Sequence, residues 1–494
     1  MDSAESTAIV STSWIKIVKM GQDIRTSRFE EQDFLEFEER LLEETRLLEQ
    51  WFSEGRFAED SPVGGFEAEA WLIHADCSPA PENESFLARL RNPDVVPELA
   101  KFNVEINTPP LVLQGSALTF METNLRRNWN HCNEIARDMD LELLATGILP
   151  TLNDRHLTLD NMSSQERFRA LNEQVLHLRQ EQPITLDIEQ VDHLFAVHRD
   201  VMLEAAATSF QIHLQVRASS APRFYNASVL ASAPLVAVAA NSPYLFGASL
   251  WDETRIPLFE QAVSVAPRRS QQAKRVTLGA AYVRESLVEC FRENLGTYAV
   301  LLPTLMDERT ENFAHLRLHN GTIWRWNRPL LGFDAFGAPH FRIEHRVVPA
   351  GPSLVDMIAN AALYFGFVHA LAEDDVPPEL RISFSDAKNN FYAAARWGLE
   401  AELVWLDHKR VAVRSLLTDV VLPLARSGLV KLGLDIDDVS RFLGIIEGRL
   451  RTGQTGTVWQ RAFIRRFGMN RKALTSAYRE HQNRGKPVHE WDQY

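Results

Sequence analysis

The amino-acid sequence predicts an α+β protein built on a mainly antiparallel sheet. Segments in which apolar and polar residues alternate, as in half-buried strands, recur between residues 64 and 348. Long segments with helical periodicity separate these strands, and beyond Pro352 the sequence becomes mostly helical. This order of strands, long helices and a helical tail is typical of an α+β fold.

The chain has 494 residues, without an internal repeat or a low-complexity linker. We therefore expect one large mixed domain rather than separable modules. The expected organisation is an N-terminal extension with an amphipathic helix (1–55), a single main domain (56–475) and a polar C-terminal tail (476–494).

Composition argues against several classes of protein. The net charge of −14 is unfavourable for binding nucleic acid, and we expect no such partner. Three cysteines lie far apart without CxxC spacing, which is the usage of a reducing compartment. No window approaches about 18 consecutive apolar residues, and the N-terminus lacks a basic region followed by an apolar stretch. We expect a soluble, cytoplasmic protein that does not bind membranes.

The elements of the first third can be assigned from their periodicity. Residues 28–54 carry apolar residues at helical spacing among many acids and predict an amphipathic helix. After a Gly-Gly turn, residues 66–73 predict a strand, and residues 102–110 predict another that two prolines end. A long helix is expected over 116–139 and a buried strand over 141–150.

The remaining elements follow in the same way. A polar helical region is expected at about 163–182, a strand over 208–216, and an Ala-rich helix within 227–247 that Asn-Ser-Pro ends. Residues 341–348 predict a further strand. Helices are then expected over four segments: 355–371, 386–407, 411–428 and 437–451.

Two carboxylates stand one residue apart in the strand around GGFEAEAW, residues 64–71. Residues i and i+2 of a strand point to the same face, so Glu67 and Glu69 are expected to lie side by side. Two such carboxylates repel unless a cation lies between them. The same alternation also fits an ordinary strand with one solvated face, and the pair alone does not decide between a cation site and solvent.

Polar residues alternate in the same way on three other predicted strands. The set is Glu67 and Glu69; Glu105 and Asn107; Gln211, His213 and Gln215; Arg342, Glu344 and Arg346. Four such strands could line one concave surface, where converging carboxylates would suit Mg²⁺ and a histidine would tolerate Mn²⁺. Alternatively, His213 is a hydrogen-bonded core residue and the Arg-Glu-Arg set is a ladder of ion pairs. Composition alone also allows a sugar-binding or metal-storage protein.

Seven motifs in one order resemble the glutamate–cysteine ligase family of the carboxylate–amine ligase type. They are GFEAEAW, ELAKFNVEINTPP, TSFQIHLQV, AANSPYLFG, FRIEHRVVPAGPS, NNFYAAARWGLEAEL and TGTVWQRAF, spread over roughly residues 60–470. The resemblance implies a glutamine-synthetase-like fold, in which a curved, mainly antiparallel sheet forms a funnel with metal ions and nucleotide on its concave face. Helices would flank this sheet, and residues 56–475 would form the catalytic domain.

The resemblance also implies roles for particular residues. The family's metal ligands fall on Glu67, Glu69, Glu98, Glu105, His213 and Glu344. Glu98 could instead be a surface residue, because it precedes the strand. The sequence departs from the family pattern at Pro349, which replaces an acidic residue.

Four further residues are assigned to catalysis or to nucleotide binding. Arg346, with Arg342 behind it, is expected to clamp the moving phosphoryl group or the substrate carboxylate, because a guanidinium forks onto paired oxygens. Asn241 is expected to contact the nucleotide, although it could simply end a helix. Arg461 lies in a basic segment (449–468) that could close over phosphates or form a solvated basic face.

The implied chemistry is ATP-dependent amide formation with Mg²⁺, or Mn²⁺, through an acyl phosphate. The expected substrates are glutamate and an amine such as cysteine, and the oligomeric state stays open. The alternatives are a ligase that joins glutamate to a different amine and a non-catalytic relative that binds nucleotide or amino acid. The intact set of ligand-type residues favours an enzyme.

Overall fold

A computed structural model describes residues 23–24, 26–60, 62–265, 274–334 and 336–494. The first 22 residues of the predicted N-terminal extension lie outside this range. The helices are α1 (Glu31–Ser53), α2 (Asn83–Leu90), α3 (Ala117–Arg137), α4 (Glu166–Leu178), α5 (Ala221–Ala239), α6 (Arg255–Ala262), α7 (Val288–Thr297), α8 (Ala314–Gly321), α9 (Leu354–Ala372), α10 (Phe384–Trp397), α11 (Val413–Leu416), α12 (Leu422–Lys431), α13 (Ile436–Thr452), α14 (Gly456–Phe467) and α15 (Arg471–Asn483). The strands are β1 (Val63–His74), β2 (Val95–Pro97), β3 (Asn103–Asn107), β4 (Leu111–Val112), β5 (Leu141–Leu144), β6 (Ile184–Glu189), β7 (His193–His198), β8 (Phe210–Val216), β9 (Tyr244–Leu245), β10 (Ala248–Ser249), β11 (Asn327–Phe333), β12 (Pro339–His345), β13 (Glu402–Trp405) and β14 (Lys409–Ala412).

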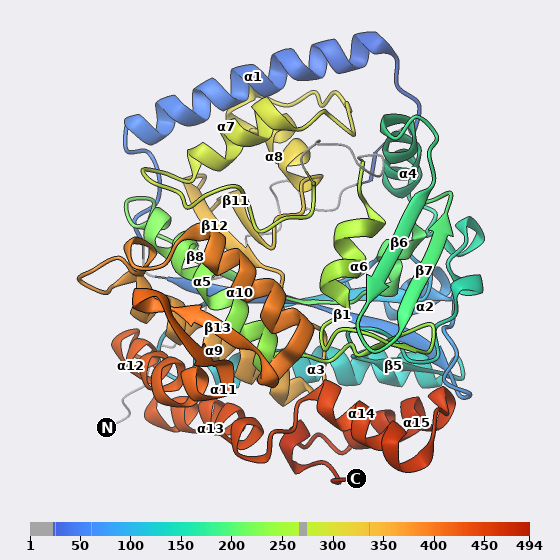
Figure 1. Ribbon diagram of the computed structural model, residues 1–494. Coiled ribbons are helices and arrows are strands. Elements are labelled where there is room, and N and C mark those ends of the chain that lie inside the picture. The colour runs from blue at the N-terminus through green and yellow to red at the C-terminus, as the bar shows by residue number, and fades with distance from the viewer. Residues whose placement is uncertain (1–22, 25, 61, 266–273, 335) are drawn as a thin grey trace, which may run out of the picture.

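The main sheet is curled and antiparallel, which confirms the predicted fold class (Figure 1). Its strands run in the order β11-β12-β8-β1-β3-β2, and β4 and β5 also pair with β1. Every pairing in this sheet is antiparallel. The four strands predicted to carry polar residues, β1, β3, β8 and β12, are therefore neighbours in one surface.

One face of the sheet belongs to the main hydrophobic core. Phe66, Ala68 and Ala70 of β1 and Ile343 of β12 are almost completely buried in it, together with alternate residues of β8. Helices α3, α5 and α9 pack on this face, and α5 contacts α9 along much of its length. Because side chains alternate along a strand, the acids between these apolar residues all point to the opposite face.

Helix α9 shows why apolar length alone does not identify a membrane span. Among the described residues, it is the one helix long and apolar enough to cross a membrane. However, 89% of its most apolar window is buried inside the protein. It packs against α5, α12 and α13 and is a core helix.

A second hydrophobic cluster covers the end of β1 beyond the acids. Trp71 and Ile73 are fully buried in it, with apolar residues from β6, α4, α6, α14 and α15. The indole nitrogen of Trp71 donates hydrogen bonds to the Thr146 carbonyl at 3.0 Å and to Thr208 Oγ1 at 3.1 Å. This cluster closes the polar face of the sheet on one side.

Both predicted end segments pack against the rest of the protein. Phe37, Leu41 and Leu48 of α1 lie in the main core, next to α7 and α8. The boundary predicted at residue 475 falls within α15, and downstream the side chain of Trp491 is 3% exposed. The division into domains remains a prediction, but neither described end is detached from the core.

The helix predicted over 386–407 is shorter in the structure. Helix α10 ends at Trp397, and the next residue, Gly398, has a positive φ of 52°. The chain then enters the β13–β14 hairpin, where Glu402 pairs with Ala412. Leu403 and Trp405 of this hairpin are buried alternately, which is the spacing of a strand, so the predicted helix ran past the point where the period changes.

Candidate active site

The strand register brings the predicted acids together on the polar face of the sheet. Glu69 of β1 lies opposite Glu105 of β3, and Glu344 of β12 lies opposite His213 of β8. Gly65 of β1 is the partner of His213, which places Glu67 diagonally across from the imidazole. Three adjacent strands thus contribute an acid or a histidine to one place.

Glu67, His213 and Glu344 form the tightest group. One ligand atom from each residue can be chosen so that all three lie within 4.8 Å of one another. His213 Nε2 is 3.4 Å from Glu67 Oε1 and 3.8 Å from Glu344 Oε1, and it is buried without a hydrogen-bond partner. Two carboxylates and a buried, unpaired imidazole nitrogen make a donor set that fits Mg²⁺ or Mn²⁺.

Glu344 is held by two arginines. Arg328 of β11 donates to Glu344 Oε2 at 2.7 Å from Nε and to Oε1 at 2.9 Å from NH2, a two-pronged contact. Arg346 donates to Glu344 Oε2 at 3.0 Å and also to Gln211 Oε1. Burial alone would raise the pKa of Glu344, but the charges of Arg328 and Arg346 outweigh it and hold this pKa far below its usual range. Glu344 is therefore ionised, and its carboxylate is oriented by the hydrogen bonds from both arginines.

The pKa of Glu67 is lowered on folding, as is that of Glu344. Burial opposes its ionisation, but the neighbouring charge of His213 outweighs this effect and the pKa of Glu67 is lowered. The pKa values of both acids next to His213 are thus lowered, which favours their ionised forms.

Glu69, Glu98 and Glu105 form a second acidic group beside the first. Glu69 accepts hydrogen bonds from Ser209 N at 2.7 Å, from Ser209 Oγ at 2.6 Å and from Gln211 Nε2 at 2.8 Å. Burial and the negative charge of Glu69 raise the pKa of Glu98 to about 7. Burial and the charge of Glu67 likewise raise the pKa of Glu105. Buried carboxylates this close together repel one another when ionised, and a nearby positive charge would reduce this repulsion.

Sequence reasoning missed Arg328 and Glu204. Arg328 lies in β11, an edge strand that Pro329 made hard to recognise, because proline cannot donate to a sheet ladder. Glu204 lies in the short 3₁₀ helix Met202–Ala206, ahead of β8. Burial, followed by the charges of Glu98 and Glu69, raises the pKa of Glu204 to about 8. No motif marks this acid, because only the fold brings it to the site.

These raised pKa values predict how stability depends on pH. An unfolded glutamic acid loses its proton near pH 4.5, whereas Glu98 and Glu204 keep theirs in the folded protein until about pH 7 and about pH 8. Between these limits the folded state binds more protons, so the metal-free protein is expected to become less stable as the pH rises from about 4.5 to about 8. Melting temperatures in EDTA across this range measure the slope, and Glu204→Gln should reduce it. A slope that is unchanged by Glu204→Gln would contradict the assignment.

Arg342 differs from the other two arginines near Glu344. It lies two residues before Glu344 on the same face of β12 and opposite Gln215 of β8. Its Nε is buried without a hydrogen-bond partner, and its guanidinium makes no ion pair with any residue that the structure describes. Burial lowers its pKa, while the charges of Glu67 and Glu344 act in the opposite direction. The structure therefore holds one unengaged guanidinium at the predicted site.

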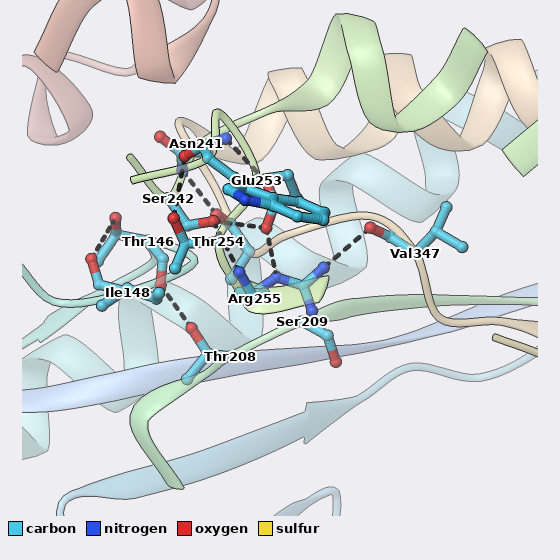
Figure 2. Close-up of polar contacts among 12 residues, drawn as sticks. Thr146, Ile148, Thr208, Ser209, Asn241, Ser242, Glu253, Thr254, Arg255 and Val347 are labelled. Atoms are coloured by element: carbon cyan, nitrogen blue, oxygen red, sulfur yellow. Dashed lines mark hydrogen bonds and ion pairs between the residues drawn. The ribbon is translucent and has the colours of Figure 1, made fainter. Parts of the chain in front are cut away.

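Asn241 lies in a separate hydrogen-bonded network (Figure 2). Its amide nitrogen donates to the Ala350 carbonyl and to the Tyr478 hydroxyl, each at 2.8 Å, and its Oδ1 accepts from Gln460 at 3.1 Å. The residue is fully buried. A nucleotide contact by this side chain would require these bonds to break, so the predicted role in nucleotide binding remains a prediction without structural support.

The same network braces the segment after β12. Glu253 accepts from Asn241 N at 3.0 Å, from Ser242 Oγ at 2.7 Å and from Arg255 Nε at 2.9 Å (Figure 2). Arg255 then donates to the Val347 carbonyl at 2.9 Å, one residue beyond Arg346. The Asn-Ser-Pro turn thus helps to fix the chain where it leaves the site.

Arg461 is also engaged within the protein. Its guanidinium donates to Ser249 Oγ at 2.7 Å, to the Leu250 carbonyl at 2.6 Å and to Asp252 Oδ1 at 3.1 Å. None of these partners belongs to the acidic groups described above. The assignment of Arg461 to nucleotide binding stays a prediction.

Comparisons with known proteins agree with the fold and the order of motifs. The sequence profile of the glutamate–cysteine ligase family 2 (GCS2) matches residues 64–482. No curated protein sequence matches the chain significantly. The structure is similar to that of glutamate–cysteine ligase from Francisella tularensis in complex with AMP, with a TM-score of 0.57 at 12% identity, over 87% of this chain and 89% of that one. It is also similar to a bifunctional glutathione synthetase from Pasteurella multocida, with a TM-score of 0.53 at 11% identity, over 90% of this chain and 55% of that one.

Proposed function

Because the chain belongs to glutamate–cysteine ligase family 2, a family of carboxylate–amine ligases, we propose that it joins the γ-carboxylate of L-glutamate to the amine of L-cysteine with ATP. The observation that carries this proposal is the meeting of Glu67, His213 and Glu344 from three adjacent strands. An ordinary solvated strand does not explain a histidine nitrogen that is buried without a hydrogen bond between two acids. A catalytic metal site explains why the three groups meet.

A carboxylate is a poor acyl donor, because its oxide is a poor leaving group. Transfer of the γ-phosphate of ATP to the carboxylate gives an acyl phosphate, and the amine then displaces phosphate to form the amide. The AMP bound to the Francisella relative supports the use of a nucleotide. Mg²⁺ or Mn²⁺ bound at such a site would supply positive charge to offset the negative charge that develops during transfer.

The residues of this chain have distinct parts in the proposed reaction. Glu67, His213 and Glu344 would hold one ion, and the group of Glu69, Glu98 and Glu105 would hold another. Arg328 and Arg346 keep Glu344 ionised and in place through their hydrogen bonds. Arg346 adds positive charge next to these acids, where the phosphoryl group would move.

Ser209 and Gln211 orient Glu69 in the same way, by donating to both of its oxygens. Holding each carboxylate in a fixed position lowers the reorganisation needed during the reaction. The proposed setting for this chemistry is the cytoplasm, in keeping with the three cysteines, which are all free.

The contacts described above concern the acidic groups and the side chains that hold them, and none of them selects the acceptor amine. A ligase of the same chemistry with a different amine would use the same site. A non-catalytic nucleotide-binding or amino-acid-binding relative is disfavoured, because the set of potential metal ligands is intact.

The test is a phosphate-release assay with ATP, Mg²⁺ and glutamate against a panel of amines, with identification of the product by mass. Glutamate and cysteine should give a γ-glutamyl amide and one phosphate for each ATP consumed. Turnover with another amine alone would change the acceptor and keep the ligase. ATP binding without phosphate release for any amine would indicate a binding protein instead.

A further inference from the structure

Three arginines surround Glu344, and only one of them is unengaged. Arg328 donates to Glu344 and to the Gly321 carbonyl, and Arg346 donates through NH1 to Glu344 and Gln211, although its Nε has no hydrogen-bond partner. Arg342 makes no hydrogen bond or ion pair within the described part of the chain. It is nevertheless largely buried, on the same face of β12 as Glu344.

Burying a guanidinium donor without a partner is costly, and Nε of Arg342 is such a donor, because it has lost water and gained no hydrogen bond. Glu67 and Glu344 are near enough to influence its pKa, but neither carboxylate comes within ion-pair distance of it. Both acids would also be neutralised by a bound metal ion. Arg342 is therefore available to an anionic group that comes with the substrate.

The surroundings of Arg342 on the side away from Glu344 are electropositive. His340 precedes it by two residues on the same face, and burial, with the charges of Arg342 and Arg317, lowers the pKa of His340 to about 3. Burial and the charge of Arg342 lower the pKa of Arg317, on α8, to about 10. Two guanidinium groups, Arg342 and Arg317, thus lie near enough to His340 to influence its pKa, while Glu308 and Glu44 offset part of the charge of Arg317.

The spacing along β12 suits the length of one substrate. Residues i and i+2 of a strand are roughly 6.6 Å apart, so Arg342 lies about that far along β12 from the acid beside the proposed metal ion. The two carboxylate carbons of an extended glutamate are about 5 Å apart. With the γ-carboxylate at Glu344 and Glu67, the α-carboxylate can reach the guanidinium, and a two-pronged contact suits both groups.

We propose that Arg342 binds the α-carboxylate of the glutamate whose γ-carboxylate reacts, and so selects an acid of this length. The inference rests on the proposed function, in which glutamate is the acyl donor. The three arginines then have different roles, because Arg342 contacts the substrate whereas Arg328 and Arg346 position Glu344. Aspartate, shorter by one methylene, could not reach both places at once.

The experiment compares Arg342→Gln with the unaltered enzyme on two acids, glutamate and 4-aminobutanoate, which lacks the α-carboxylate. The KM for glutamate should rise about 10- to 100-fold, as expected for a lost charged hydrogen bond, while the KM for ATP stays within about threefold. The unaltered enzyme should prefer glutamate strongly, and the variant should use both acids with similar efficiency. Arg342→Lys should recover part of the loss, because it keeps the charge without the planar fork.

Two further measurements keep the result unambiguous. Equilibrium binding of glutamate, in the presence of a non-hydrolysable ATP analogue, should weaken in Arg342→Gln without any turnover being required. Arg309→Gln, at an arginine whose side chain is 80% exposed, is the control and should change neither KM. If the unaltered enzyme does not use glutamate, the proposed function fails before Arg342 is tested.

Other outcomes overturn the inference itself. A raised KM for ATP with an unchanged KM for glutamate would make Arg342 a phosphate ligand. A variant that melts at a lower temperature but keeps its preference for glutamate would make the residue structural.

Discussion

Replacing Glu67 with glutamine is expected to lower kcat at least about 100-fold, a loss of a few kcal/mol of transition-state stabilisation, while the protein stays folded. The substitution removes one ligand charge and almost no volume. The only polar contact of Glu67 in the described structure is with His213, at 3.4 Å, so few hydrogen bonds depend on its charge. Steady-state kinetics with saturating Mg²⁺, together with a melting curve, would measure both effects.

Glu402 offers a matched control, because it is also a strand glutamate but points to solvent from β13. Glu402→Gln should leave kcat unchanged. If Glu67→Gln retained nearly full turnover, the alternative in which these acids merely line a solvated strand would be restored, and the proposed metal site would fail.

Replacing Glu344 with alanine is expected to lower the free energy of unfolding by about 3–5 kcal/mol and to abolish turnover. The side chain of Glu344 is completely buried, and its removal leaves Arg328 and Arg346 without their shared anion. Because its pKa is lowered on folding, the contribution of Glu344 is fully present above about pH 4.5 and is lost only as the pH falls towards the folded pKa. Urea unfolding at pH 7 in EDTA would measure the loss.

A double-mutant cycle with Arg328→Met shows whether the loss belongs to this contact. In the double variant the destabilisation should be smaller than the sum of the two single losses, since no buried charge of that pair is left unpaired. Strictly additive losses would mean that Glu344 and Arg328 do not stabilise each other. The role of Glu344 as a rigid, ionised ligand would then have to be abandoned.

The alternation of residues predicted most strands of the main sheet and the face on which each acid lies. In β1, Phe66, Ala68 and Ala70 enter the core, so Glu67 and Glu69 point the other way wherever this strand is placed. The same holds for His213 and for Glu344. The resemblance to a family then predicted that these strands surround a common site, and the sequence profile of that family matches residues 64–482.

Three strands and the environment of Asn241 were not predicted from local sequence patterns. Strand β11 contains Pro329, which is unusual within a strand, and the hairpin of β6 and β7 lies in a stretch to which no element was assigned. Asn241 was expected at the nucleotide because of its motif, yet its hydrogen bonds go to Ala350, Tyr478 and Gln460. A sequence motif shows which side chain is present at a position, but it does not show whether that side chain already forms hydrogen bonds within the protein.

The sequence by itself determined the fold class, the polar face of the sheet and the chemical type of every acid on it, because these depend on spacing between residues close in the chain. Only the tertiary structure decided which charges meet. Strand register places Arg328 of β11 opposite Glu344, with which it forms an ion pair. Arg342 and Arg346 both stand two residues from Glu344 along β12, but only Arg346 donates a hydrogen bond to it. The reason is that a pairing energy depends on distance and burial, and both are set by contacts between residues far apart in the chain.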